Sequence, residues 1–201
     1  MPKLWEESID THRRAVRDAA LDAVGALVAA HGLRGVTMSG IAARAGIGRA
    51  TLYRHFQDAE SVLAAWHARH VARHVDHLIH LRDGEGTALE RLEAVLVAYG
   101  ESVRAQPRDE IAASLHGGAH IDEAHHRLTG IVAELIAEAV RDGDVRADID
   151  AVELARYSLS ALAAAAGVES GAAVGRLAMV TLSGLMSSGW PRGGGAAELT
   201  R

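Results

Sequence analysis

Residues 37–56 read T-M-S-G-I-A-A-R-A-G-I-G-R-A-T-L-Y-R-H-F, and this stretch decides the fold of the chain around it. Thr37 has a hydroxyl that can cap a short helix beginning at the next residue. Gly46 ends that helix after two turns, because glycine readily adopts the conformation that closes a helix. A second short helix follows, in which Leu52 and Phe56 lie one turn apart as buried anchors. Two short helices joined by a glycine turn have the dimensions of a helix-turn-helix.

A longer amphipathic helix precedes this pair. Its apolar residues recur at spacings of three and four between Val16 and His31, and charged residues occupy the other faces. Thr11 is the expected N-cap and Gly32 the expected stop. Three helices within so short a stretch predict a compact N-terminal head, which we take as a domain of residues 1–58.

The rest of the chain also favours helices. The whole chain has only seven aromatic residues and three prolines, and no segment alternates with the period of a strand. Apolar periodicity and helix breakers predict six further helices, at residues 58–81, 87–106, 109–115, 121–141, 150–168 and 172–187. The predicted fold class is therefore all-α, with nine helices in two domains. The second domain covers residues 59–190, and a disordered tail is expected over 191–201.

Composition excludes several classes of protein. With 49% hydrophobic residues the chain can bury a core, and with no cysteine it can have neither disulfides nor thiolate zinc sites. Residues 1–10 contain Glu6, Glu7 and Asp10 and no apolar core, so no signal peptide is predicted. No apolar run approaches the roughly 18 residues that span a bilayer. We therefore expect a soluble, cytoplasmic protein without a membrane partner.

The charge is distributed unevenly along the chain. The formal net charge is −5, but residues 1–80 contain ten basic and eight acidic residues, whereas residues 81–201 contain 11 basic and 18 acidic ones. Between Thr11 and Glu60 there are seven arginines and only four acidic residues. A basic head on an acidic body is typical of a protein whose head alone meets a polyanion.

No sequence signature of an enzyme is present. The chain lacks a G-x-S-x-G elbow, an H-E-x-x-H pair, a P-loop and any cysteine. The Gly46–Gly48 segment follows a helix rather than a strand and has no third glycine at position 51, so a dinucleotide-binding loop is not predicted. We expect neither a catalytic function nor a cofactor.

The second helix of the pair presents an outward face that suits a nucleic acid. With its apolar anchors buried, Arg49, Ala50, Tyr53 and Arg54 face outward, and a helix of this width fits the major groove. Arginine can pair bidentately with guanine, while hydroxyl and guanidinium groups can bind phosphates and set the register. The candidate DNA-binding residues are Thr37, Arg44, Gly48, Arg49, Ala50, Thr51, Tyr53, Arg54 and His55.

The run A-G-I-G-R-A-T-L-Y-R-H-F, residues 45–56, resembles the DNA-binding segment of the TetR (tetracycline repressor-like) family of bacterial regulators. The similarity by motif extends over about fifty residues, and the link D-G-D-V-R-A-D-I-D at 142–150 is also similar to the link before the eighth helix in many members. Two positions differ from the family pattern. Gly48 replaces a common Ser or Thr, and Ala59 replaces a Lys that often precedes the glutamate, so two potential phosphate contacts are missing.

The resemblance implies a one-component transcriptional regulator, with repression favoured over activation. A homodimer would bind a near-palindromic operator in double-stranded DNA, and a small-molecule effector in the C-terminal domain would release it. The alternative is a ligand or metal sensor that acts mainly through protein partners and retains a vestigial head. Arg44, Arg49, Thr51 and Tyr53 argue against that alternative, because they preserve the DNA-binding face.

The effector site can be predicted only in outline. Because aromatic residues are scarce, the pocket should be lined mostly by aliphatic side chains. The candidate polar or aromatic effector-binding residues are Trp66, His70, Tyr99, His116, His120 and Tyr157.

Two groups of histidines could suggest a metal site. His67, His70, His74 and His77 recur at spacings of three and four, and a pair such as His70 and His74 could bind zinc or nickel. His116, His120, His125 and His126 form the second group. A solvated or interface face accounts for the first group better, and no metal site is predicted in either.

In this family the last two helices pack against those of a second copy as a four-helix bundle. Residues 150–187 carry more apolar residues than one core face needs, with small residues that permit close approach. We therefore predict a homodimer built from this segment, with Leu177 and Leu182 on the shared surface.

Overall fold

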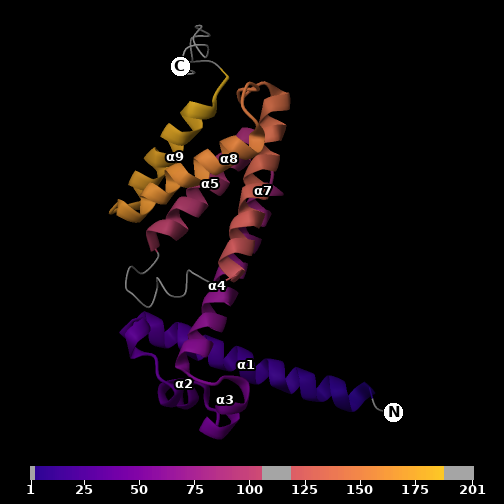
Figure 1. The fold of residues 1–201 in the computed structure, drawn as a ribbon, viewed down its shortest axis with the longest axis vertical. Helices are drawn as coiled ribbons and strands as arrows, with labels where there is room; N and C mark the ends of the chain where they lie inside the picture. Colours follow the sequence, from indigo (N-terminus) through magenta and orange to yellow (C-terminus); the bar gives the residue numbers. More distant parts are fainter. Residues whose placement is uncertain (1–2, 106–118, 188–201) are drawn as a thin grey trace, which may run out of the picture. The chain divides into compact units, whose positions relative to one another are not determined.

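A computed structural model describes residues 3–105 and 119–187 of the chain, with the side chains of 10–105 and 121–187 (Figure 1). Within these residues there are eight α-helices, two 3₁₀ helices and no strand, which confirms the all-α fold class. The short helix expected at residues 109–115 and the tail expected at 191–201 lie outside the described residues.

Helix bounds follow the expected pattern closely. In chain order the elements are α1 Lys3–His31, η1 Leu33–Gly35, α2 Met38–Ala45, α3 Arg49–His55, α4 Ala59–Arg82, α5 Ala88–Ala105, α7 Ala119–Asp142, α8 Ala151–Leu162, η2 Ala163–Gly167 and α9 Gly171–Leu185. Among these described elements, no helix is both long and apolar enough to cross a membrane.

Two expected boundaries are wrong. Thr11 does not cap α1 but lies inside it, because no glycine or proline interrupts the chain between Lys3 and Val16. The helix expected to reach Val168 ends instead at Leu162 and continues as the 3₁₀ segment η2. Ala165 is the buried residue of η2, and this tightly wound segment packs against α5.

The described residues divide into two compact units. The first contains residues 3–76 and 119–126, and the second contains residues 77–105 and 127–187. In the first unit α1, α2, α3 and the start of α4 share one core. Its centre is formed by fully or almost fully buried side chains, among them Val24, Ile41, Leu52, Phe56 and Val62.

The second unit is built around α5, which packs against α8, η2 and α9. Leu92, Leu96, Leu159 and Leu185 are among its fully buried side chains. Helices α5 and α9 approach closely at Gly100, where a Cβ atom would lie only 2.6 Å from Val174 Cγ1. A side chain at that position would therefore push the two helices apart.

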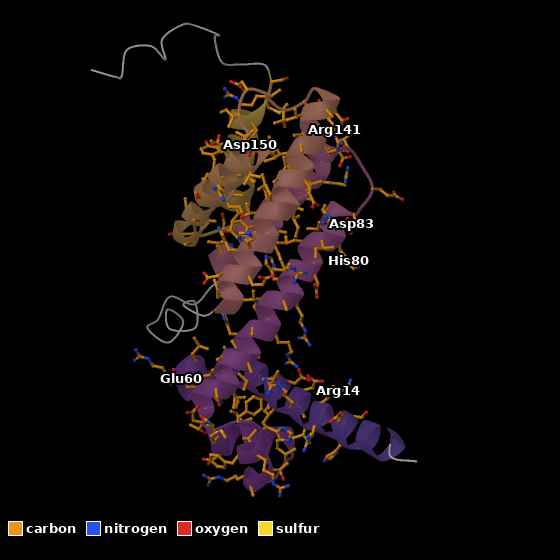
Figure 2. All side chains as sticks on the ribbon, turned by 45° about the vertical axis from the view of Figure 1, so that its right-hand side comes forward. Arg14, Glu60, His80, Asp83, Arg141 and Asp150 are labelled. Atoms are coloured by element: carbon orange, nitrogen blue, oxygen red, sulfur yellow. The ribbon has the colours of Figure 1, made fainter. Side chains whose placement is uncertain are left out.

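Polar contacts hold the ends of the helices in the second unit. Arg91 donates to the backbone oxygen of Arg82 at 2.8 Å, which caps the end of α4, and pairs with Glu138 of α7. Asp150, labelled in Figure 2, caps α8 by accepting from the Val152 amide at 2.8 Å, as expected from the sequence. At the end of α9 the Arg146 amide donates to the Leu185 oxygen at 2.9 Å, so the 142–150 link fastens that terminus.

Candidate nucleic-acid interface

The turn between α2 and α3 is set by one cap and one glycine. Thr37 accepts a hydrogen bond from the Gly40 amide at 3.1 Å and so begins α2. Gly46 ends α2 with φ 67° and ψ 27°, in the left-handed region. Its amide and that of Ile47 bond back to α2 carbonyls, which closes the helix and starts α3 three residues later.

Helix α3 has one buried and one exposed side. Leu52 is fully buried in α3, and Phe56 is buried immediately after the helix ends. Arg49, Tyr53 and Arg54 are exposed, as is Ala50 between them. Because residues four apart share a helix face, these four side chains form one solvent-facing surface. The structure therefore brings together the group expected to enter the major groove.

The other predicted contact residues flank this surface within the same unit. Thr37, Arg44 and Gly48 are exposed, whereas Thr51 and His55 are half-buried. Gly48 occupies the N-cap position of α3 and contributes no side-chain hydrogen bond. Ala59, at the start of α4, is half-buried against the core of the first unit. The position where a Lys is common in the family is therefore not fully exposed in this chain.

Charge around this surface is not neutralised locally. Among the described residues, no ion pair involves Arg44, Arg49 or Arg54. The two acidic residues of α1 next to the core are instead paired with Arg69 of α4, whose Nη2 lies 2.6 Å from Asp22 Oδ1 and whose Nη1 lies 3.6 Å from Asp18 Oδ1. The positive charge of the α2–α3 surface is thus available for a polyanion.

Sequence reasoning did not single out two further arginines of the first unit as candidate contacts. The guanidinium carbon of Arg17, on α1, lies 4.8 Å from the centre of the Phe56 ring, in a cation–π contact at the end of α3. Arg34 is exposed in η1, between α1 and α2. A separation of 39 residues hides the first contact from any local pattern, whereas Arg34 could have been found from its place beside the Thr37 cap.

The predicted effector residues lie in different surroundings. In the first unit the rings of Trp66 and His70 stack with their centres 5.9 Å apart. In the second unit Tyr99 is half-buried beside an apolar group that includes Val103 and Val174, and this burial raises the pKa of its phenol. Tyr157 is exposed on α8. His116 and the side chain of His120 lie outside the described part.

The histidines of α4 differ in their exposure. His67 is buried, whereas His70 and His77 are exposed. In the parts of the chain that the structure describes, no group of three or more histidine, aspartate or glutamate side chains is placed to hold a metal ion. Of the second histidine group, His125 and His126 are exposed on α7.

Comparison with protein families matches two parts of the chain. Residues 20–66 match the model described as bacterial regulatory proteins of the tetR family. Residues 85–187, about half of the chain, match the C-terminal domain of SbtR-like transcriptional regulators. A comparison with curated protein sequences finds no match.

Solved structures of similar fold belong to bacterial regulators. A TetR-family transcriptional regulator from Pectobacterium atrosepticum is 25% identical, with a TM-score of 0.70 over 88% of this chain and 96% of that one. A TetR/AcrR-family regulator from Thermobifida fusca is 21% identical, with a TM-score of 0.67 over 84% and 97%. FadR from Bacillus subtilis, in complex with stearoyl-CoA, is 16% identical, with a TM-score of 0.61 over 83% and 98%. The last two likenesses concern the fold alone.

Proposed function

The chain belongs to the TetR family of bacterial regulatory proteins, and from this we propose that it is a one-component transcriptional repressor acting in the cytoplasm. Its N-terminal part is the family's helix-turn-helix DNA-binding domain, and its C-terminal part is a ligand-binding domain. We assign DNA binding to residues 1–58 and effector binding with dimerisation to residues 59–190. This is a binding function, and no catalytic step forms part of the proposal.

The observation that carries the proposal is the exposed face of α3. Arg49, Tyr53 and Arg54 share this face while Leu52 and Phe56 anchor it to the core. Arginine at the start of such a helix can read guanine through two hydrogen bonds, and the flanking Thr37 and Arg44 can bind phosphates. The absence of any ion pair to Arg44, Arg49 or Arg54 among the described residues favours DNA over the alternative of a sensor that acts only through protein partners.

Binding of a near-palindromic operator requires two heads, and the surface of α8 and α9 supports a homodimer. Four large apolar side chains are exposed there, with exposed fractions of 41% for Val152, 54% for Tyr157, 56% for Met179 and 70% for Val180. Isolated apolar residues are ordinary on a surface, but four on two packed helices favour a partner that covers them. A symmetric dimer places two copies of α3 on successive turns of the major groove.

Release by an effector requires that the ligand bind one conformation better than another. We propose a small-molecule effector in the C-terminal domain, and the stearoyl-CoA complex of FadR supports this kind of ligand for the fold. The lever in this proposal is α4, because its residues 59–76 belong to the first unit and 77–82 to the second. Of the candidate effector residues, Tyr99 is the one with a phenol held among apolar side chains of the second unit.

Selection of DNA by the full chain tests the proposal. The purified protein is mixed with a pool of random double-stranded DNA, and bound fragments are recovered, amplified and sequenced over several rounds. We expect one enriched motif with two inverted half-sites whose centres lie about one helical turn, roughly 34–36 Å, apart or a multiple of it. Recovery of unenriched sequence through all rounds would overturn the assignment as a sequence-specific regulator.

A further inference from the structure

Helix α1 extends well beyond the core of the first unit. It has 29 residues, and Val16 is the first described side chain in it that is buried. Every side chain from Asp10 to Ala15 is exposed. Figure 1 shows this N-terminal part of α1 running past α2 and α3, with which it shares a unit. The extension is long enough to act as a separate surface of the head.

The exposed extension continues the face of α1 that packs on the core. Arg13 and Arg17 are followed on the same face by the buried residues Ala20 and Val24, at spacings of four, three and four. Arg17 contacts the Phe56 ring at the end of α3, so this face points to the side of α1 where α3 lies. Arg14, labelled in Figure 2, lies one helical turn before Asp18, at the border between this face and the side of Asp18 and Asp22.

Asp18 and Asp22 lie on another side of α1. Asp18 and Asp22 pair with Arg69 of α4, and the neighbouring Gly25 approaches Trp66 of α4, where a Cβ atom would lie 3.2 Å from the indole nitrogen. α1 therefore presents the carboxylates of Asp18 and Asp22 toward α4, and Arg17, with Arg13 one turn before it, toward the side of α3. Among the described side chains, this arginine side holds Arg13 and Arg17 against one acidic residue, Asp10.

One acidic residue shares the arginine side, but it holds the arginines weakly. Arg13 Nη1 lies 4.0 Å from Asp10 Oδ1, and the two side chains are 69% and 64% exposed. An ion pair so long and so exposed contributes little. Arg14 donates through Nε to the Asp10 backbone oxygen at 3.3 Å, which leaves both of its terminal nitrogens for another acceptor. Both guanidinium groups can thus exchange these contacts for a stronger one.

We propose that Arg13 and Arg14, continued by Arg17, form a second DNA contact that binds backbone phosphates flanking the bases read by α3. This inference rests on the proposed function. Guanidinium groups suit phosphate because they can donate two parallel hydrogen bonds to it. Four residues of helix advance about 6 Å, and phosphates of one strand follow each other at about 3.4 Å along the duplex axis, so Arg13 and Arg17 can meet different phosphates. The contact fixes the head on the duplex and carries no base specificity of its own.

The test compares two double variants of the full chain. Arg13→Gln with Arg14→Gln removes the proposed contact. Arg73→Gln with Arg141→Gln removes the same charge from exposed positions of α4 and α7 and serves as the matched control. Helix content by circular dichroism verifies that each variant folds. The probes are the operator recovered by selection, once with long flanks and once trimmed to the selected motif.

We expect the first variant to bind the long fragment at least tenfold more weakly, and the trimmed fragment with nearly wild-type affinity. The slope of log K against log salt on the long fragment should become shallower by about 0.9 for each lost phosphate contact. The double variant Arg13→Lys with Arg14→Lys should restore most of that slope, because both changes keep the charge.

Three outcomes would overturn the inference. One is wild-type affinity and slope of the glutamine variant on the long fragment. Another is an equal loss in the control variant, because that would indicate a general effect of net charge. The third is an equal loss on both fragments, because the contact would then lie within the motif. Binding of DNA by the wild-type protein tests the proposed function, and its absence would overturn that function and this contact together. If the wild type binds but the glutamine variant shows no loss, only the contact is overturned.

Discussion

At the scale of single residues, the helix-turn-helix depends on the backbone of Gly46. Its φ of 67° is a conformation that L side chains rarely adopt, although nothing lies within 4 Å of where a Cβ would be. Gly46→Ala should therefore destabilise the protein by about 1–2 kcal/mol through backbone strain alone. Gly130→Ala is the matched control, since Gly130 lies inside α7 without a positive φ and has nothing within 4 Å of where a Cβ would be. Thermal unfolding of both variants decides, and an equal loss at the two positions would contradict the role of Gly46.

Base reading is the second property that belongs to one residue. Arg49 is exposed at the start of α3, where a helix in the major groove touches base edges. Arg49→Ala should cost about 1–3 kcal/mol of binding free energy and relax preference at one base position in each half-site. Competition assays with operators mutated one base pair at a time measure this. An equal loss on operator and random DNA would instead assign Arg49 to phosphate binding.

At the scale of elements, α5 begins with a reciprocal cap. The Thr87 amide donates to Glu90 Oε2 at 2.8 Å, and the Glu90 amide donates to Thr87 Oγ1 at 3.2 Å. The backbone hydrogen bond from Thr87 lowers the pKa of the Glu90 carboxyl below its ordinary value. A carboxylate with a lowered folded pKa stabilises the fold above its unfolded value of about 4.3, and this contribution is lost as the pH falls through the folded value.

Glu90→Gln should accordingly lower the Tm at pH 7, and the difference from the wild type should shrink as the pH falls below about 4.3. The exposed Glu93 of the same helix gives the control variant Glu93→Gln, which should leave the Tm nearly unchanged. Thermal melts followed by circular dichroism between pH 3 and 7 provide the measurement. A Tm difference that stays constant over this range would show that the carboxylate charge does not contribute.

Local signals in the sequence predicted most elements of the fold and the inner and outer sides of α3. Thr37 and Asp150 cap the helices they were expected to cap, because capping needs only neighbouring backbone amides. Thr11 does not, since a good cap residue has no effect where the preceding residues remain helical. The contacts of Arg17 with Phe56 and of Arg69 with α1 could not be predicted, because they join residues 39 and about 50 positions apart. Such pairs follow from packing and not from local pattern.

At the scale of the whole molecule, the proposal links two binding events through one chain. If the effector weakens operator binding by some factor, the operator must weaken effector binding by the same factor. Effector affinity measured with and without operator DNA therefore tests release without identifying which conformation changes. In this proposal α4 carries the coupling, because its residues 59–76 belong to the first unit and 77–82 to the second.

Assembly is the other property of the whole molecule, and the structure changes which residues should be tested. Leu182 is buried within its own subunit and Leu177 is half-buried, so a charge at either would disturb the subunit itself. Val180, at 70% exposed, is the better position.

Val180→Glu should convert a dimer of 21.2 kDa subunits into monomers with unchanged helix content, because a desolvated carboxylate on each side of a symmetric contact is costly. Ala137→Glu, an equally simple change on the exposed side of α7, should leave the dimer intact. Light scattering coupled to size exclusion gives the masses. A Val180→Glu variant that remains dimeric would place the interface elsewhere, whereas monomers that keep only weak binding to a half-site would tie operator recognition to this surface.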